Sequence, residues 1–290
     1  MINFEYAAPT RLDEAIKQLA KAGTDAKVLA GGTDIIVQLR EGLRSAELVV
    51  DVKKIPELMR LELSSEQGLH LGASVSCRRI HDDKNIAAEY PGLVDAVRII
   101  GSWQIQSRAS VGGNLCNSSP AADGIPPLIA YAAQAHVAGP DGQRVVPVEE
   151  FCTGPGQNIL QQGELLVALT LPPQQSGTGS AYQRFIPRNE MDIAVAGAAS
   201  WVQLDADGKR IEQARIALSA VAPTPVFAAE ASGWLAGQTA SEEVFAQAGE
   251  LAKRDASPID DMRGTAEYRT HLVGVLTKRT LATACERARN

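Results

Sequence analysis

The chain has 290 residues, 45% of them hydrophobic, and a formal net charge of −6 at pH 7. This length suits one to three domains with a sizeable core, and the interspersed acidic and basic residues argue against nucleic-acid binding. No apolar run approaches the roughly 20 residues of a membrane-spanning helix, and the N-terminus lacks the basic and apolar regions of a secretory signal, so we expect a cytoplasmic protein without membrane insertion.

The first part of the chain alternates strands with helices. A short strand over residues 2–5 precedes a helix over 9–23, for which Thr10 is a candidate cap and Gly23 a terminator. The further elements predicted here are a strand at 26–30, a short helix from Thr33 to Gly42, strands at 46–52 and 68–73, a helix at 91–101, a glycine- and serine-rich loop from Ser107 that leads into a helix before Gln134, a hairpin at 135–146 and a strand at 164–172.

The composition changes at residues 172–180, where proline, glycine, serine and glutamine replace apolar residues, as in a linker. Beyond this segment the pattern predicts strands followed by helices, which is typical of an α+β domain. The predicted strands are 181–186, 193–205 and 210–221, and the predicted helices are 228–235, 242–253 and 264–287. We therefore expect two domains, at residues 1–175 and 180–290.

Two glycine pairs are the most informative local features. Gly31 to Asp34 follows a buried strand, and Ser110 to Asn114 leads into a polar loop that ends at Asp123, just before a helix. Adjacent residues without side chains let backbone N–H groups converge on an anion, and helix N-termini add unpaired donors. Each pair alone is also what a plain turn contains. Neither completes a P-loop or the Rossmann G-x-G-x-x-G pattern, so a pyrophosphate site here requires a different fold.

The metal-ligating residue types form no local motif. The four cysteines, which we expect to be reduced, lie far apart without a CxxC pair, so no such motif on this chain binds an iron–sulfur cluster or zinc. The four histidines lie outside both glycine segments and are not spaced as helical ligands. The second domain has no clustered acid and base residues. The sequence therefore indicates neither a metal site nor a catalytic residue.

Three segments together resemble one family. VLAGGTDIIVQLREG, SRASVGGNLCNSSPAAD and RNEMDIAVAG are similar to the FAD-binding medium subunit of the molybdenum hydroxylases. This is the flavoprotein family of carbon monoxide dehydrogenase, of bacterial aromatic and N-heterocycle hydroxylases and of the middle segment of xanthine dehydrogenase. The resemblance covers essentially the whole chain, including the spacing between motifs. It implies an α+β fold in which a two-part FAD-binding domain of the PCMH type precedes a smaller α+β domain of the carbon monoxide dehydrogenase flavoprotein type.

The resemblance also implies which residues bind FAD, without a covalent bond. The first glycine segment would wrap the pyrophosphate with amides, and the second would clamp the pyrophosphate and ribityl chain. Asp123 would meet polar groups of the sugar or ring, Ile100 would pack against the cofactor, and Leu166 would contact the flavin ring through its backbone. The implied set is Leu29, Ala30, Gly31, Gly32, Thr33, Asp34, Ile100, Ser110, Gly113, Asn114, Asp123, Leu166 and Gln183.

One position departs from the family. Relatives commonly carry a lysine close to the flavin in the strand after the linker, where this chain has Gln183 with Arg184 beside it. If neither residue places a positive charge there, the reduced flavin is stabilised less.

The implied function is electron transfer within a larger complex. FAD would take electrons from two [2Fe–2S] clusters on a small partner subunit and pass them to an external acceptor, while a large subunit with the molybdenum cofactor hydroxylates the substrate. The expected assembly is a dimer of heterotrimers. Between Cys116 and Cys152 the chain lacks the cysteine-rich insertion that some relatives carry for a [4Fe–4S] cluster.

Two alternatives remain open. An autonomous flavin-dependent oxidase or dehydrogenase of the same FAD fold often attaches its flavin through a histidine near the first glycine segment, and no histidine is present there. A non-redox nucleotide-binding protein would use the same two glycine segments for any nucleoside diphosphate, and the flavin spectrum of the purified chain distinguishes it.

Overall fold

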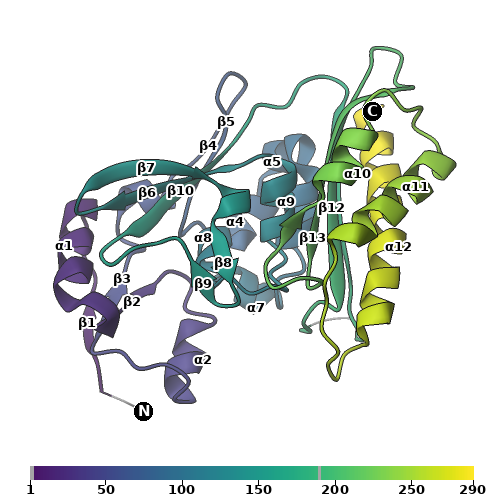
Figure 1. The fold of residues 1–290 in the computed structure, drawn as a ribbon. Helices are drawn as coiled ribbons and strands as arrows, with labels where there is room; N and C mark the ends of the chain where they lie inside the picture. Colours follow the sequence, from purple (N-terminus) through teal and green to yellow (C-terminus); the bar gives the residue numbers. More distant parts are fainter. Residues whose placement is uncertain (1–2, 189–190) are drawn as a thin grey trace.

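A computed structural model describes residues 3–188 and 191–290 (Figure 1). Within these residues the chain forms three main β-sheets, in chain order, and one two-stranded ribbon. Helices and strands are mixed throughout, so the expectation of an α+β fold is confirmed. No helix in the described ranges is both long and apolar enough to cross a membrane.

The first sheet is parallel, and its strands follow the order β1-β3-β2. Since parallel strands end at the same edge, the turn after β2 and the segment after β3 leave the sheet side by side. The elements of this part are β1 (Glu5–Ala7), α1 (Leu12–Ala22), β2 (Ala26–Leu29), α2 (Ile35–Arg40), β3 (Leu48–Asp51) and α3 (Pro56–Met59).

The prediction that Thr10 caps α1 was wrong, because the residue before the helix is Arg11, one position later, and it makes no side-chain cap. The first strand also lies later than the predicted 2–5.

The second sheet is antiparallel, in the order β4-β5-β10-β6-β7. Its elements are β4 (Leu61–Ser64), β5 (Gly68–Gly72), β6 (Gln134–Gly139), β7 (Gly142–Pro147) and β10 (Leu165–Leu171). A bulge at Val167 shifts the register of β10, so Leu166, Leu169 and Leu171 all join the same core. The helices against this sheet are α4 (Cys77–Asp82), α5 (Lys84–Glu89), α6 (Pro91–Val97), α7 (Trp103–Gln106), α8 (Val111–Asn117) and α9 (Ile125–Ala130). The ribbon is β8 (Cys152–Gly154) with β9 (Gln157–Asn158).

The third sheet is antiparallel and follows the order β11-β12-β13-β14. Its elements are β11 (Thr178–Phe185), β12 (Ala196–Leu204), β13 (Ile211–Ser219), β14 (Val226–Phe227), α10 (Ala229–Trp234), α11 (Glu242–Ala252) and α12 (Ala266–Ala288). Helices α10 to α12 cover one face of this sheet and share a core with it, while α6 and α9 pack on the other face (Figure 1). The second domain is therefore buried against the first through a whole sheet face.

Polar contacts hold the two domains and their linker together. The amide of Gly92 donates to Ser180 Oγ at 3.0 Å, and Arg287 of α12 donates to the carboxylate of Asp95 at 2.6 Å. The linker is also tied down, because Tyr90 Oη donates to Pro172 O and Trp201 Nε1 donates to the side chain of Gln174, both at 2.8 Å. The segment with linker composition is thus docked on both domains.

The second glycine pair differs most from expectation. The sequence predicts a polar loop here, but helix α8 begins directly after Ser110, whose Oγ accepts a hydrogen bond from Gly113 N at 3.0 Å. A Cβ on Gly112 would lie 2.5 Å from the carbonyl oxygen of Ala73, so this glycine is needed for the helix to approach the end of β5. Capping and tertiary packing therefore override the low helix propensity of two glycines.

Candidate functional site

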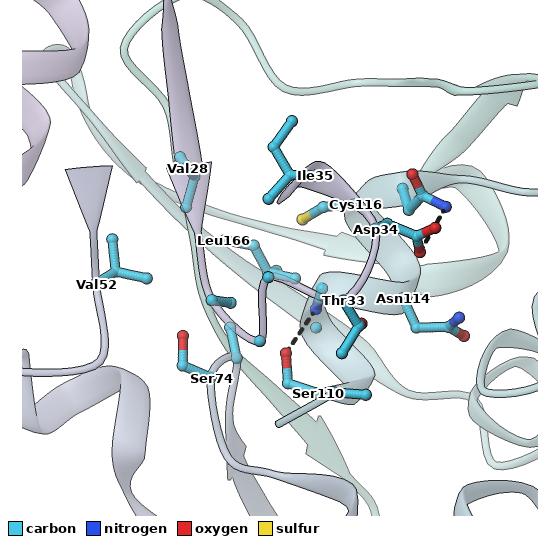
Figure 2. Close-up of a pocket in the computed structure, with 18 of the residues that line it drawn as sticks. Val28, Thr33, Asp34, Ile35, Val52, Ser74, Ser110, Asn114, Cys116 and Leu166 are labelled. Atoms are coloured by element: carbon cyan, nitrogen blue, oxygen red, sulfur yellow. Dashed lines mark hydrogen bonds between the residues drawn. The ribbon is translucent and has the colours of Figure 1, made fainter. Parts of the chain in front are cut away.

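A cavity of about 260 Å³ lies where the edge of the first sheet meets the start of α8 (Figure 2). The turn after β2, the segment that enters α8 and the start of β10 form its walls. Ten of the thirteen residues implied by the resemblance line it, namely Ala30, Gly31, Gly32, Thr33, Asp34, Ile100, Ser110, Gly113, Asn114 and Leu166. The structure therefore brings both glycine segments together around one space.

The turn after β2 offers unused backbone donors to this cavity. Within the described residues, the amides of Gly31, Gly32 and Thr33 donate no hydrogen bond to another protein group. Native backbone amides nearly always have an acceptor, either in the protein or from a ligand or water. Three successive open amides on one turn can donate to the oxygens of an anion such as pyrophosphate.

The two glycines of this turn are required for different reasons. Gly32 adopts φ +80°, a conformation that favours glycine, and turns the chain toward α2. Gly31 has no such φ, but a Cβ on it would lie 2.3 Å from the carbonyl oxygen of Arg108. Gly31 therefore lets the two segments touch each other, a role that the sequence interpretation, which considered a turn and the approach of a ligand, did not include.

The start of α8 lies opposite this turn. A Cβ on Gly113 would meet Ser110 Oγ at 2.9 Å and Ala30 Cβ at 3.9 Å, so the remaining space beside it is the cavity itself. Asn114 Oδ1 accepts a hydrogen bond from Gly124 N at 3.0 Å, which orients the side chain and leaves its NH₂ group as a donor. Asp34 accepts from Asn117 Nδ2 at 3.3 Å and so links the two segments.

Ser74 is a cavity residue that sequence reasoning missed. It follows β5, is 3% exposed, and its Oγ has no hydrogen-bond partner in the described part of the chain (Figure 2). A buried hydroxyl without a partner costs about 1–3 kcal/mol, so it marks a place for a polar atom of a ligand. The signal in the sequence is a serine directly after an apolar strand, in GLHLGAS.

The cavity has one thiol and no recognisable metal site. Cys116 lines it as a free cysteine, and burial raises the pKa of its thiol to about 12, so the group stays protonated. Within residues 3–188 and 191–290 no group of three or more His, Cys, Asp or Glu side chains could hold a metal ion. None of the four histidines is among the residues that line the cavity.

Three of the implied residues lie outside the cavity. Leu29 is 9% exposed and packs in a small core with Leu39 and Val49.

Gln183 lies on β11, whose alternate residues face opposite sides. The neighbours Tyr182 and Arg184 both bond Asp123 of the first domain, whereas Phe185 packs in the core with α12. Gln183 shares the face of Phe185, so its side chain points away from Asp123. Arg184 rather than Gln183 is the residue of this pair that reaches the first domain.

Asp123 lies in a buried polar cluster between the domains. It forms an ion pair with Arg184, and the two side chains are 9% and 6% exposed. Tyr182 Oη donates to its other oxygen at 2.7 Å. Burial raises the pKa of Asp123 to about 6, because the cost of desolvating the carboxylate exceeds the stabilisation by Arg184 and Tyr182. Arg184 also donates to the carbonyl of Ile99 at 2.9 Å, next to the cavity residue Ile100.

This shift predicts a pH dependence of stability. The folded chain retains a proton on Asp123 between about pH 4 and 6, where the unfolded chain has released it, so stability falls as pH rises through this window. Relative to an Asp123→Asn variant, we expect the wild-type free energy of unfolding to decline by up to about 3 kcal/mol as pH rises from about 4 to 6. Above about pH 6 the difference should no longer change. Urea denaturation at several pH values measures the difference, and a difference that does not change with pH would contradict the assignment.

Comparisons with known proteins agree with this architecture. Residues 2–174 match the model of the FAD binding domain in molybdopterin dehydrogenase, and residues 180–284 match the CO dehydrogenase flavoprotein C-terminal domain. The chain is 32% identical to the xanthine dehydrogenase FAD-binding subunit of Escherichia coli O157:H7, with 97% of each chain covered. It is 33% identical to the carbon monoxide dehydrogenase medium chain of Afipia carboxidovorans, with 99% of each covered. Carbon monoxide dehydrogenase from Hydrogenophaga pseudoflava superposes with a TM-score of 0.94 at 31% identity, with 99% of each chain covered.

Proposed function

Since this chain belongs to the family of FAD-binding medium subunits of molybdenum hydroxylases, we propose that its cavity holds FAD without a covalent bond. The observation that carries this proposal is the set of open amides at Gly31, Gly32 and Thr33, which face the start of α8 across the cavity. The unpartnered hydroxyl of Ser74 supports it, because a purely apolar ligand would leave that group unpaired.

The residues that line the cavity divide into polar donors and apolar surface in this assignment. The three amides and the Thr33 hydroxyl bind pyrophosphate oxygens, while the Asn114 NH₂ group donates to a neighbouring polar atom. Ile100 and Leu166 provide apolar surface for the rings and exclude water from them. Bound FAD supplies the two-electron chemistry, and the protein sets its position and potential. No residue of this chain is assigned as an acid, base or nucleophile.

Asp123 and Gln183 take revised roles in this proposal. Asp123 acts through Arg184, which holds the carbonyl of Ile99 and so positions the adjacent Ile100. Gln183 is left out of the cofactor site, because its side chain lies on the α12 face of β11. Arg184 then provides a buried positive charge beside the Ile100 wall, in place of the family lysine.

The chain functions, in this proposal, as an electron carrier between partner subunits and an external acceptor. Electrons arrive from [2Fe–2S] clusters on a small subunit, and a large subunit holds the molybdenum cofactor, in a dimer of heterotrimers. Relatives named as medium chains or FAD-binding subunits support a multi-subunit assembly. The cytoplasmic location expected from the sequence stays a prediction.

An absorption spectrum of the purified chain tests the cofactor assignment. We expect flavin bands that move into the supernatant as FAD after acid precipitation. Colour that stays with the pellet would show covalent attachment and favour an autonomous oxidase. A colourless chain that also fails to take up added FAD would contradict the proposal and favour a non-redox nucleotide-binding protein.

A further inference from the structure

Lys53 lies just beyond β3, at the edge of the first sheet from which the glycine turn leaves. Its Nζ donates to the carbonyl oxygen of Ala30 at 2.9 Å and to Asp51 Oδ1 at 2.7 Å. The Lys53 side chain is 22% exposed and does not line the cavity. It therefore contacts the turn from outside the ligand space.

The ammonium group is held in place by a carboxylate with several donors. Asp51 also accepts from the backbone N–H of Lys53 at 3.0 Å and from Tyr6 Oη at 2.8 Å. Burial raises the pKa of Asp51, but these hydrogen bonds outweigh it and hold the pKa below its ordinary value. The series Tyr6, Asp51, Lys53 and Ala30 thus runs across all three strands of the sheet to the glycine turn.

The contact with Ala30 fixes the orientation of the next amide. In a trans peptide the C=O of one residue and the N–H of the following residue point in opposite directions, and the described residues contain no cis bond. The carbonyl of Leu29 is held as well, by Val52 N at 3.2 Å. With two successive carbonyls held on the β3 side, the N–H of Gly31 must point away from Lys53. Gly31 lines the cavity on that other side.

We propose that Lys53 is a positioning residue for the phosphate site: it holds the Ala30 carbonyl so that the glycine-turn amides face the pyrophosphate before the cofactor binds. The inference rests on the proposed function, since it assumes that FAD occupies this cavity. Pre-organised donors bind an anion without the cost of ordering the turn, so loss of this contact weakens FAD binding more than it weakens the fold.

Three variants of the full chain test this role. Lys53→Met removes the contact, Lys53→Arg retains a charged donor, and Lys54→Met removes the same charge from the adjacent exposed position. FAD is removed from each purified chain, its dissociation constant is measured by flavin fluorescence, and the melting temperature of the FAD-free form is recorded. We expect Lys53→Met to weaken FAD binding roughly 10- to 100-fold, the range for a hydrogen bond to a charged group.

The controls separate positioning from folding. Lys54→Met should bind FAD within about twofold of wild type and keep its FAD-free melting temperature, and Lys53→Arg should recover most of the affinity. Lys53→Met should lower the FAD-free melting temperature only slightly, because Asp51 is 13% exposed and keeps its hydrogen bonds from Tyr6 and from the backbone. Equal FAD affinity in Lys53→Met and Lys54→Met would overturn the inference. So would a loss in Lys53→Met that is matched by a lower FAD-free melting temperature and not rescued by arginine. A wild-type chain that does not bind FAD would instead contradict the proposed function itself.

Discussion

A Gly113→Val variant of the full chain is expected to fold and to be purified without flavin. The new side chain extends into the cavity between Ser110 and Ala30, because a Cβ at this position meets little else. Valine is a better helix former than glycine, which offsets part of the cost of moving the Ser110 hydroxyl that a Cβ would meet at 2.9 Å. Overlap with the proposed phosphate site should cost about 3 kcal/mol or more, which is over 100-fold in FAD affinity.

A matched control separates this effect from a general cost of replacing glycine. Gly233 is an exposed helical glycine of α10 at which a Cβ would meet nothing within 4 Å. Gly233→Val should therefore retain FAD at the wild-type ratio of flavin to protein, measured by absorbance. Circular dichroism should show both variants folded. Full FAD occupancy in Gly113→Val would mean that the phosphate site lies elsewhere.

Removal of Arg184 is expected to destabilise the chain strongly. An Arg184→Met variant leaves Asp123 buried without its counter-ion, and loss of one partner from a buried pair costs about 3–5 kcal/mol. Asp123 should then take up a proton more readily, so the stability loss should shrink as pH falls toward 5. Urea denaturation at pH 7.5 and pH 5 measures both effects.

Arg254→Met provides the comparison for an exposed pair. Arg254 and Glu230 are 63% and 55% exposed, and such a pair contributes less than about 1 kcal/mol. A loss in Arg184→Met as small as that in Arg254→Met would show that the buried pair does not stabilise the contact between the domains. If Arg184→Met lost as much stability at pH 5 as at pH 7.5, the stabilisation by Arg184 would not depend on the charge of Asp123.

Most of the longer strands and helices could be predicted from the sequence because periodicity and linker composition are local, whereas the short elements β4, α3, α5 and α7 and the β8–β9 ribbon were not predicted. The α+β succession in the second domain and the hairpin around Gly142 are examples, and the structure has both. The start of α8 could not be predicted, because two glycines read as a loop unless Ser110 caps the helix and Gly112 packs against Ala73. Those contacts are tertiary.

The lining of the candidate cavity was predicted in part. The sequence pattern marked both glycine segments, and the resemblance implied Ile100 and Leu166, all of which line the cavity. Gln183 and Arg184 point to opposite faces of β11. Which of them meets the first domain could not be predicted, because both faces are covered by protein. Lys53 and Ser74 matter through contacts with distant segments, so their own surroundings in the sequence carry little signal.

The docked linker limits which segments of this protein can be replaced by the corresponding segments of a relative. Asp123 comes from the first domain and its counter-ion Arg184 from the second, while Tyr90 and Trp201 hold the segment between them. A chimera joined at 172–180 would inherit one half of each pair. Grafting therefore has to transfer these partners together, and the two domains are expected to diversify as a matched set rather than as independent modules.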